Sequence, residues 1–302
     1  ALGGVAGSLG SELGCERRRP ALRLGTNLWP GYEPLYLARD QGLLDRHRVN
    51  LREFTSASEV LRGLRNGMLE AGCLTLDEVM VLVAEGFPMA VMLVLDASHG
   101  ADALVVQPGL RNLRGCTLGV EPNALGAYMR LRTLEHLKLK ATEVRVVELA
   151  IDDQEARFRA GKVDGVITFE PVRTQLILAG GQVAFDSTQL PGEIVDVLAV
   201  RRSALVPHRE TLAHLRSAWH QGLALLGREP DRAHALMGRR LGLTPPQVQQ
   251  ALKGLRFFSE AEELEARRRG LHPTVARLSE VMLQAMLLPR GVTPEEVLGG
   301  GA

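Results

Sequence analysis

The sequence predicts an α/β protein of two lobes, each built on a mainly parallel β-sheet with flanking helices, and three observations support this prediction. From Ala21 onward, short apolar runs alternate with amphipathic helical stretches, as they do when helices join parallel strands. This alternation occurs in two blocks, separated by a break at residues 97–100. After residue 201 the strand signal stops and helix follows helix up to residue 287, so we expect the C-terminal helices to pack on the first lobe.

The first block is expected to contain strands joined by three helices. Apolar runs predict strands at residues 21–27, 49–55, 71–76 and 89–96. Helical spacing predicts helices at residues 33–44, 58–66 and 77–85. Ser58 is a candidate N-cap for the second of these helices, and Gly67 follows it as a stop signal.

The second block repeats this rhythm. Strands are predicted at residues 103–107, 117–121, 144–149, 165–169, 182–186 and 194–201, and helices at residues 124–137, 153–160 and 171–178. We expect the chain to cross between lobes near residues 100 and 200, so that residues 21–100 and 201–302 form lobe 1 and residues 101–200 form lobe 2. Two open sheets joined by two crossings can hinge, and ligands bind outside the carboxyl ends of such strands. The pattern therefore predicts a clamshell that closes on a small molecule.

Composition excludes several classes of protein. The chain has 302 residues, 45% of them apolar, which is enough for a real core and fits about two domains of roughly 150 residues. Its 36 basic and 35 acidic residues leave a net charge of +1. This charge is too small to produce the positive electrostatic field that attracts nucleic acid. No run of about 18 uncharged apolar residues could span a bilayer. The three cysteines are too scattered for a disulfide framework or a zinc site. We expect a monomer without metal or cofactor.

The first twenty residues differ from the rest. Residues 1–13 are small, rich in glycine and weakly apolar, and Gly14 precedes Cys15. A small residue before a cysteine is typical of a lipid-attachment site at the end of an export signal, which makes Cys15 a candidate for lipid attachment. Glu12 stands where such signals usually carry leucine, so the alternative is a disordered extension.

Several short motifs follow one another along the chain. The longest is LGTNLWPGYEPLYLAR at residues 24–39, with Gly-Leu-Leu at residues 42–44. The others lie at residues 74–78, 94–98, 120–121, 124–128, 161–165 and 168–171. Together they resemble the solute-binding proteins of ABC importers in the nitrate, sulfonate, taurine and thiamine-precursor superfamily. The resemblance covers residues 21–201 and implies the clamshell of type II periplasmic binding proteins. It also implies delivery of a solute to an ABC permease and its ATPase, in the periplasm or at the outer face of the cytoplasmic membrane.

The resemblance also implies where the ligand is held. In this family the ligand residues lie in the loops after the first three strands and at the strand ends of the second lobe. In lobe 1 the matching positions are Trp29, Tyr32, Ser56, Ser58, Thr75 and Asp77. In lobe 2 they are Glu121, Asn123, Tyr128, Phe169 and Glu170.

The charged residues at the predicted strand ends are all acidic, and this set adds Asp96 to the candidate site. They are Asp77, Asp96, Asp102, Glu121, Glu170 and Glu193. Relatives that bind nitrate or bicarbonate are expected to offer basic or histidine groups in the second lobe, so this lining argues against a small inorganic anion. Asp77 could instead cap its helix, and Asp96 and Asp102 could order the first crossing.

Aromatic rings beside carboxylates form a site for an amine or another cation. We expect Trp29 to act as a stacking platform, with Tyr32 and Tyr128 as walls; packing in the core is the alternative for Trp29 and Phe169. Thr75, Ser56 and Asn123 would supply hydrogen bonds, and Glu121 and Glu170 would receive the donor end of the solute. The predicted helix starts at Ser58 and Ala124 favour anions, which a zwitterion or a polar heterocycle would also satisfy. The predicted ligand is an amine-bearing or heterocyclic solute.

No nucleophile elbow, P-loop, dinucleotide-binding glycine motif or metalloprotease motif occurs in the sequence, so we expect a binding protein and not an enzyme. Two alternatives stay open. One is an enzyme of the same clamshell fold, of the menaquinone-pathway type or of the thiamine-pyrimidine type, although the latter needs a cysteine cluster. The other is a cytoplasmic solute sensor.

Overall fold

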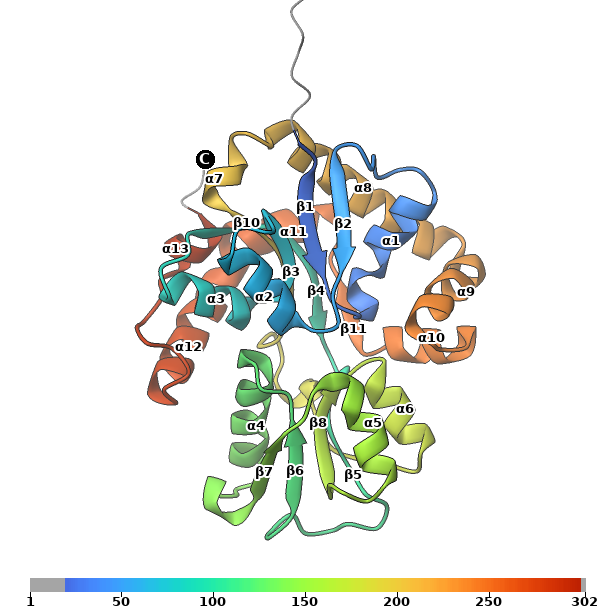
Figure 1. Ribbon diagram of the computed structural model, residues 1–302, viewed down its shortest axis with the longest axis vertical. Coiled ribbons are helices and arrows are strands. Elements are labelled where there is room, and N and C mark those ends of the chain that lie inside the picture. Colours follow the sequence, from blue (N-terminus) through green and yellow to red (C-terminus); the bar gives the residue numbers. More distant parts are fainter. Residues whose placement is uncertain (1–19, 300–302) are drawn as a thin grey trace, which may run out of the picture.

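The computed structural model describes residues 20–299 and places two α/β lobes one above the other (Figure 1). The first sheet has the strand order β11-β4-β10-β3-β1-β2. Its strands are β1 (Leu22–Thr26), β2 (Val49–Glu53), β3 (Ala71–Thr75), β4 (Met89–Ser98), β10 (Val195–Arg201) and β11 (Leu255–Phe257). The second sheet has the order β7-β6-β8-β5-β9. Its strands are β5 (Asp102–Val106), β6 (Thr117–Val120), β7 (Arg145–Glu148), β8 (Gly165–Phe169) and β9 (Gln182–Asp186).

Both sheets are mixed, although most strands of each run in one direction. Strand β1 is parallel to β2 and β3, whereas β10 is antiparallel to β3 and β4 and β11 is antiparallel to β4. Strand β6 is parallel to β7 and β8, whereas β5 is antiparallel to β8 and β9. The crossings explain why β5 and β10 run antiparallel to their neighbours. Each strand enters its lobe directly from a crossing, so it begins at the end of the sheet where the neighbouring strands end.

Helices cover both faces of each sheet. In lobe 1 they are α1 (Glu33–Asp40), α2 (Ala57–Arg65), α3 (Leu76–Ala84), α7 (Arg202–Leu205), α8 (Arg209–Arg228), α9 (Pro230–Leu241), α10 (Pro245–Leu252), α11 (Glu260–Glu265), α12 (Leu271–Gln284) and α13 (Pro294–Leu298). One core contains residues of α2, α3, α12 and α13, and the core on the other face contains residues of α1 and α8. The C-terminal helices therefore pack on the first lobe, as expected.

Lobe 2 has three longer helices. They are α4 (Ala124–His136), α5 (Ile151–Arg159) and α6 (Val172–Leu178). One core packs α4 against the sheet, and the other packs α5 and α6 against its opposite face (Figure 1). The short helical turns of the two lobes are η1 (Pro30–Tyr32) and η4 (Ala266–Gly270) in lobe 1, and η2 (Ala141–Glu143) and η3 (Ser187–Gln189) after residue 101.

The structure corrects where the chain returns to lobe 1. Residues 195–200 were predicted in lobe 2, but β10 lies between β3 and β4 in the first sheet. The return crossing therefore precedes Val195 instead of lying near residue 200. All residues of β10 up to Val200 are buried, as in a central strand covered on both faces. Strand β11 lies within the region predicted to be wholly helical, because three residues are too few to produce a strand pattern.

Two helices of lobe 1, α2 and α3, begin one residue earlier than predicted. Helix α2 begins after Ser56, not Ser58. Helix α3 begins after Thr75, whose N–H donates to Glu78 Oε2 at 3.1 Å, so Thr75 and not Asp77 is the N-cap. The candidate lipid-attachment residue Cys15 lies outside the described residues and stays a prediction.

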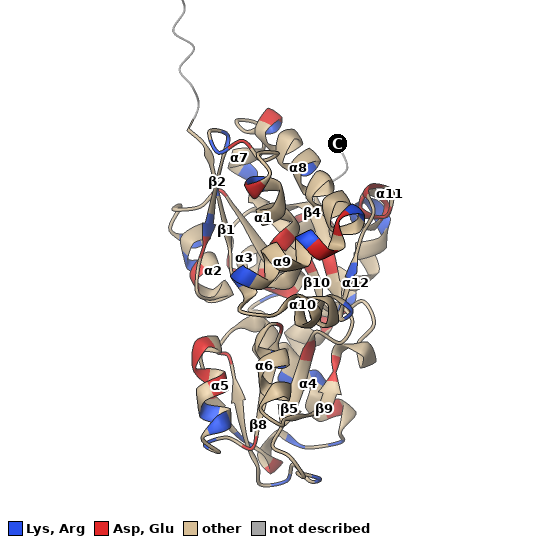
Figure 2. Ribbon diagram, turned by 90° about the vertical axis from the view of Figure 1, so that its right-hand side faces the viewer, with Lys and Arg blue, Asp and Glu red and all other residues tan. Residues whose placement is uncertain are grey.

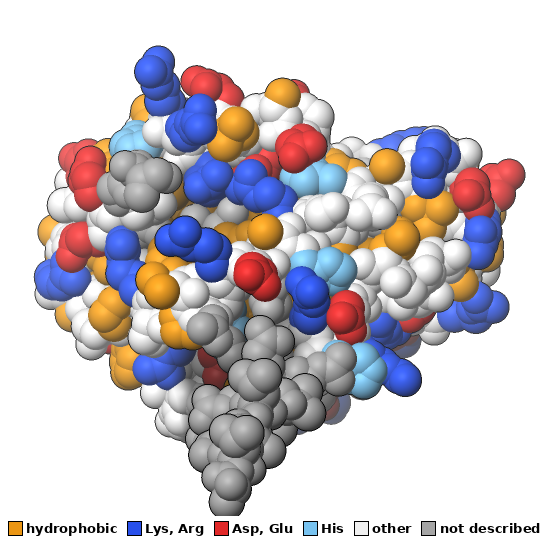
Figure 3. Space-filling model, turned by 90° about the horizontal axis from the view of Figure 1, so that it is seen from above, with side chains coloured by type: hydrophobic (Ala, Val, Ile, Leu, Met, Phe, Trp, Pro, Cys, Tyr) orange, Lys and Arg blue, Asp and Glu red, His pale blue; other side chains and the backbone are white. Residues whose placement is uncertain are grey.

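Charges on the surface are mixed in sign. On the face seen in Figure 3, Lys and Arg side chains lie among Asp and Glu side chains, in keeping with the net charge of +1. Within residues 20–299, no helix combines the length and apolar character needed to cross a membrane.

Candidate functional site

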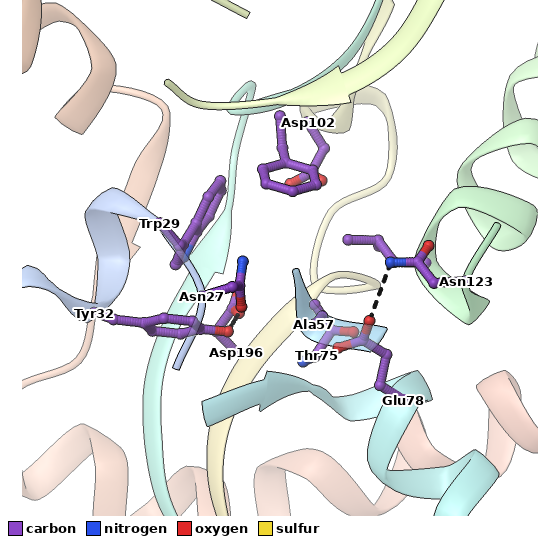
Figure 4. Close-up of a pocket in the computed structure, with 11 residues that line it drawn as sticks. Asn27, Trp29, Tyr32, Ala57, Thr75, Glu78, Asp102, Asn123 and Asp196 are labelled. Atoms are coloured by element: carbon purple, nitrogen blue, oxygen red, sulfur yellow. Dashed lines mark hydrogen bonds between the residues drawn. The ribbon is translucent and has the colours of Figure 1, made fainter. Parts of the chain in front are cut away.

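A small cavity lies where the two lobes face each other (Figure 4). It is lined by Asn27, Trp29, Tyr32, Ala57, Thr75, Glu78, Asp102, Asn123, Leu125, Phe169 and Asp196. The space open to the centre of a water-sized sphere is about 20 Å³. Since one water needs about 10–15 Å³ on this measure, the cavity has room for little more than a single water. The structure therefore describes the lobes closed around this point.

Lobe 1 contributes one row of residues across its sheet. Asp96 of β4 pairs with Asp196 of β10, and Asp196 pairs with Thr75 of β3. Like charges in directly opposite positions destabilise a sheet, so this row is an unusual place for two carboxyl groups. In Figure 2 the acidic segments of lobe 1 include stretches of β4 and β10 that point toward lobe 2. Asp196 lines the cavity and Asp96 is hydrogen-bonded to the lining residue Trp29, so this row lies at the end of the sheet that faces the cavity.

The Trp-Pro-Gly-Tyr turn places two aromatic side chains over this row. Trp29 Nε1 donates to Asp96 Oδ2 at 3.4 Å, and the Tyr32 hydroxyl donates to Asp196 Oδ1 at 2.5 Å. A Cβ atom at Gly31 would lie 2.1 Å from Asp96 Oδ2 and 2.3 Å from Trp29 Nε1. Only glycine at position 31 therefore allows this close approach of the turn to the sheet.

Lobe 2 contributes the matching end of its own sheet. Asp102 at the start of β5 pairs with Phe169 at the end of β8. The Phe169 ring meets the Trp29 ring edge-on, with centroids 5.8 Å apart and an interplanar angle of 76°. Asn123 caps α4 by accepting from the Gly126 N–H at 2.7 Å. Two contacts thus join the lobes at the cavity: the Trp29–Phe169 ring pair and a hydrogen bond from Asn123 to Glu78.

Asn123 is the polar bridge across the cleft. Its Nδ2 donates to Glu78 Oε1 at 3.4 Å, drawn as a dashed line in Figure 4. Glu78 belongs to α3 of lobe 1 and is 1% exposed. Its other oxygen accepts from the Thr75 N–H, so the side chain joins the helix start to the opposite lobe.

The cavity is acidic and has no basic lining residue. Burial raises the pKa of Asp102 to about 7, with a further contribution from the charges of Asp77 and Glu170. Burial, together with neighbouring carboxylates, raises the pKa of Asp196 and of Glu78 well above the usual value. Burial also raises the pKa of Asp96. The site therefore favours neutral carboxyl groups until a cation or a set of N–H donors approaches.

Several buried oxygen atoms around the cavity have no hydrogen-bond partner. They are Thr75 Oγ1, Asp77 Oδ2, Asp96 Oδ1, Asp102 Oδ2, Glu121 Oε2 and Thr168 Oγ1. Leaving such a group unpaired costs about 1–3 kcal/mol. An ionised carboxylate only accepts hydrogen bonds, so each of these carboxyl oxygens, once ionised, needs a donor that the described residues do not provide. No group of three or more His, Cys, Asp or Glu side chains in residues 20–299 is arranged to hold a metal ion.

The structure brings some of the predicted site residues together. Five of them line the cavity: Trp29, Tyr32, Thr75, Asn123 and Phe169. Asp96 lies behind Trp29, to which it is hydrogen-bonded. Glu121 lines a second, adjacent cavity within lobe 2.

Other predicted residues do not line the cavity. Ser56 and Ser58 flank Ala57, which is the lining residue of that segment. Asp77 is 2% exposed in the first turn of α3, outside the lining. Tyr128 packs into the core of lobe 1 and donates to Glu193 Oε2 at 2.6 Å.

Glu170 was predicted to receive the ligand, but its oxygens already have partners within lobe 2. Oε1 accepts from Arg173 Nη1 and Oε2 accepts from the Thr174 N–H, both at 3.1 Å. The carboxylate therefore stabilises the start of α6 and is not directed to the cavity.

Sequence reasoning missed six lining residues: Asn27, Ala57, Glu78, Leu125, Asp196 and, as a site residue, Asp102. Glu78 could have been found, because Thr75 followed three residues later by glutamate is the capping-box pattern. Asp196 could not, because its place depends on the pairing of β10 with strands more than 90 residues away in sequence.

The raised pKa values predict an unusual dependence of stability on pH. The pKa of both Asp102 and Glu121 is raised to about 7, mainly by burial. A carboxyl group whose pKa is higher in the folded protein than in the unfolded chain stabilises the fold below the unfolded pKa, and this stabilisation is lost as pH rises through about 7. Every tenfold difference in acid dissociation constant between the folded and unfolded states corresponds to about 1.4 kcal/mol.

We therefore expect the ligand-free protein to have a lower melting temperature at pH 8 than at pH 5.5. The Asp102→Asn variant, which cannot ionise at this position, should show a smaller difference. Thermal unfolding at both pH values measures this, and a melting temperature that is equal or higher at pH 8 would contradict it.

A family model described as NMT1-like matches residues 16–236. The chain is 26% identical over 170 residues to the taurine-binding periplasmic protein of Escherichia coli (strain K12), covering 54% of this chain. That alignment spans about half the length of the relative, 53%. The chain is 23% identical over 262 residues to a putative aliphatic sulfonates-binding protein of the same organism, covering 82% of this chain and 80% of that relative.

Solved structures resemble the whole described fold. The alkanesulfonate-binding protein of Xanthomonas axonopodis pv. citri, bound to MOPS, aligns with a TM-score of 0.78 at 18% identity, covering 93% of this chain and 98% of that one. The ligand-binding component of an ABC-type import system from Staphylococcus aureus, with zinc bound, aligns with a TM-score of 0.77 at 12% identity and the same coverage. These alignments show that the fold is the two-lobed clamshell of periplasmic binding proteins.

Proposed function

The chain belongs to the NMT1-like family, and on that premise we propose that it is the solute-binding component of an ABC importer. Relatives named as taurine-binding and aliphatic-sulfonates-binding proteins support this assignment. The protein would capture a small solute in the periplasm or at the outer face of the cytoplasmic membrane. It would then deliver the solute, chemically unchanged, to a permease that is driven by its ATPase.

The single observation that carries the choice of ligand is the acidic lining of the cavity, which we propose selects an amine-bearing or nitrogen-heterocyclic solute. Glu78, Asp102 and Asp196 line it, and none of its lining residues is basic. At 4 Å, two like charges repel by about 4 kcal/mol at an effective dielectric constant of 20. A sulfonate would meet this repulsion from every ionised carboxylate, whereas an ammonium would be attracted and would supply the missing donors.

Capture requires the lobes to separate. The closed cavity holds about one water. To admit a solute, the Trp29–Phe169 ring contact and the Asn123–Glu78 hydrogen bond must open, because both lie between the lobes. Closure on the solute then brings the lobes together around it, and the solute takes the place of these direct contacts, with Trp29 against it as a stacking surface. Binding thus shifts a population of open molecules toward the closed arrangement.

Isothermal titration calorimetry on protein that has been unfolded, dialysed and refolded tests this function. The panel pairs each alkylamine with the sulfonate of the same carbon chain, and adds aminopyrimidines as heterocycles. We expect heat from amine-bearing compounds at pH 8 and none from the simple alkyl sulfonates. Tight sulfonate binding with silent amines, or silence from every nitrogen compound at millimolar concentration, would contradict the proposed ligand class.

A further inference from the structure

A second chamber adjoins the cavity and lies within lobe 2. It is lined by Asp102, Glu121, Asn123, Leu125, Gly126, Met129, Ile167, Thr168 and Phe169. Four of these residues, Asp102, Asn123, Leu125 and Phe169, also line the first cavity. The two spaces are therefore neighbours, with shared side chains between them. In the closed structure the second one is open to the centre of a water-sized sphere over only about 10 Å³.

The second chamber contains buried oxygen atoms that lack partners. Glu121 is 6% exposed and Thr168 is 2% exposed. Glu121 Oε2 and Thr168 Oγ1 make no hydrogen bond, and neither does Oδ2 of Asp102, which is shared with the first cavity. No lining residue is Lys, Arg or His. A buried carboxylate without a hydrogen-bond partner lowers the stability of the folded protein. A hydrogen-bond donor bound in the second chamber would remove this destabilisation.

Contacts with lobe 1 hold two of the side chains that the two spaces share. Phe169 lines both, and its ring is held on one side by the edge-on contact with Trp29 of lobe 1. Asn123, the second shared residue, is bound across the cleft to Glu78. Both contacts are made with lobe 1, so separation of the lobes would release two of the four shared side chains and open a route for a solute to Glu121.

We propose that the solute carries two amino groups, one held in the first cavity near Asp196 and Glu78 and the other in the second chamber against Glu121. This inference deepens the proposed function and rests on it, because it assigns the ligand class more narrowly for the same site. Carboxyl groups line both spaces, Asp196 and Glu78 in the first cavity and Glu121 in the second chamber, so a solute with a donor at each end matches them. Of these three side chains, Glu121 is the one with a fully buried oxygen that has no hydrogen-bond partner. A monoamine would fill only one of them.

The test compares unbranched diamines of three to six carbons with monoamines of the same chain length, by calorimetry at pH 8. We expect the best diamine to bind at least about tenfold more tightly than its monoamine. In Glu121→Gln, diamine affinity should fall at least about tenfold and monoamine affinity should stay within about twofold. Glu148→Gln, at the exposed end of β7, is the matched control and should change neither.

A second variant guards against a purely structural effect. Glu121→Asp keeps the carboxylate but withdraws it by one methylene, so the preferred diamine should become about one carbon longer. Equal binding of diamines and monoamines by the unaltered protein, or an equal loss of both in Glu121→Gln, would overturn the second subsite while leaving the proposed function in place. If no amine binds at all, the proposed ligand class fails and this inference fails with it.

Discussion

Replacing Trp29 by alanine should weaken binding of the solute at least about tenfold, or about 1.4 kcal/mol. Trp29 lines the cavity, meets Phe169 of the other lobe edge-on and donates to Asp96. The substitution removes a ring that can attract a cation and also the aromatic contact that holds the lobes together. Calorimetry with the tightest-binding amine measures the loss.

Controls must separate this loss from unfolding, because Trp29 is 4% exposed and its truncation costs stability of about 3–5 kcal/mol. Trp29→Phe keeps a ring and should lose less affinity. Trp219→Phe alters the other tryptophan, which is buried in the core of lobe 1 away from the cavity, and should lower the melting temperature without weakening binding. Unchanged affinity in Trp29→Ala would remove this residue from the site.

Replacing Glu193 by glutamine should both destabilise the protein and weaken binding. Glu193 lies in the segment that returns from lobe 2 to β10, and its side chain is 3% exposed. It accepts from the Tyr128 hydroxyl at 2.6 Å and from Arg132 Nε at 2.9 Å, both on α4 of lobe 2. It also accepts from Arg277 on α12 of lobe 1. One carboxylate thus joins both lobes and the crossing between them.

Removal of one partner from a fully buried ion pair lowers the free energy of unfolding by about 3–5 kcal/mol. Because Arg277 is half exposed and screened by solvent, we expect a smaller loss of about 2 kcal/mol. The melting temperature should then fall by about 4–8 °C. Affinity should fall as well, because the closed arrangement loses its connection through Arg277.

The matched control is Glu85→Gln. Glu85 pairs with Arg65 on the surface of lobe 1, with both side chains about one-third exposed, so its loss should cost less than about 1 kcal/mol. Equal melting temperatures and affinities for Glu193→Gln and the unaltered protein would show that this carboxylate does not hold the lobes together.

The succession of elements could be predicted from sequence because each depends on local pattern. The strands at residues 165–169 and 182–186 occur as predicted, since each is a short run between clear helix and turn signals. Elements whose identity depends on distant pairing were misplaced or missed. Strand β10 was assigned to the wrong lobe, and β11, a three-residue edge strand that pairs only with β4, was not predicted at all.

The site residues divide in the same way, into those indicated by local sequence and those whose position depends on distant pairing. Trp29 and Tyr32 were found because a Pro-Gly turn after a strand exposes its neighbours at the sheet end. Asp196 was missed because only the register of β10 sets it beside Asp96. Tyr128 and Glu170 were placed in the cleft because sequence position shows the element but not the direction of the side chain. Of the six acidic residues predicted at strand ends, Asp102 lines the cavity, whereas the other two acidic lining residues, Glu78 and Asp196, were not predicted.

The most direct test of the account measures the distance between the lobes. Spin labels at Met68 in lobe 1 and Leu178 in lobe 2, which are 52% and 61% exposed, report this distance by pulsed electron paramagnetic resonance. The native cysteines are first replaced by alanine. With a saturating amine we expect one narrow and shorter distance, and with the sulfonate of the same carbon chain the broader distribution of the ligand-free protein. A distribution that is the same in all three samples, or that the sulfonate alone narrows, would contradict the account.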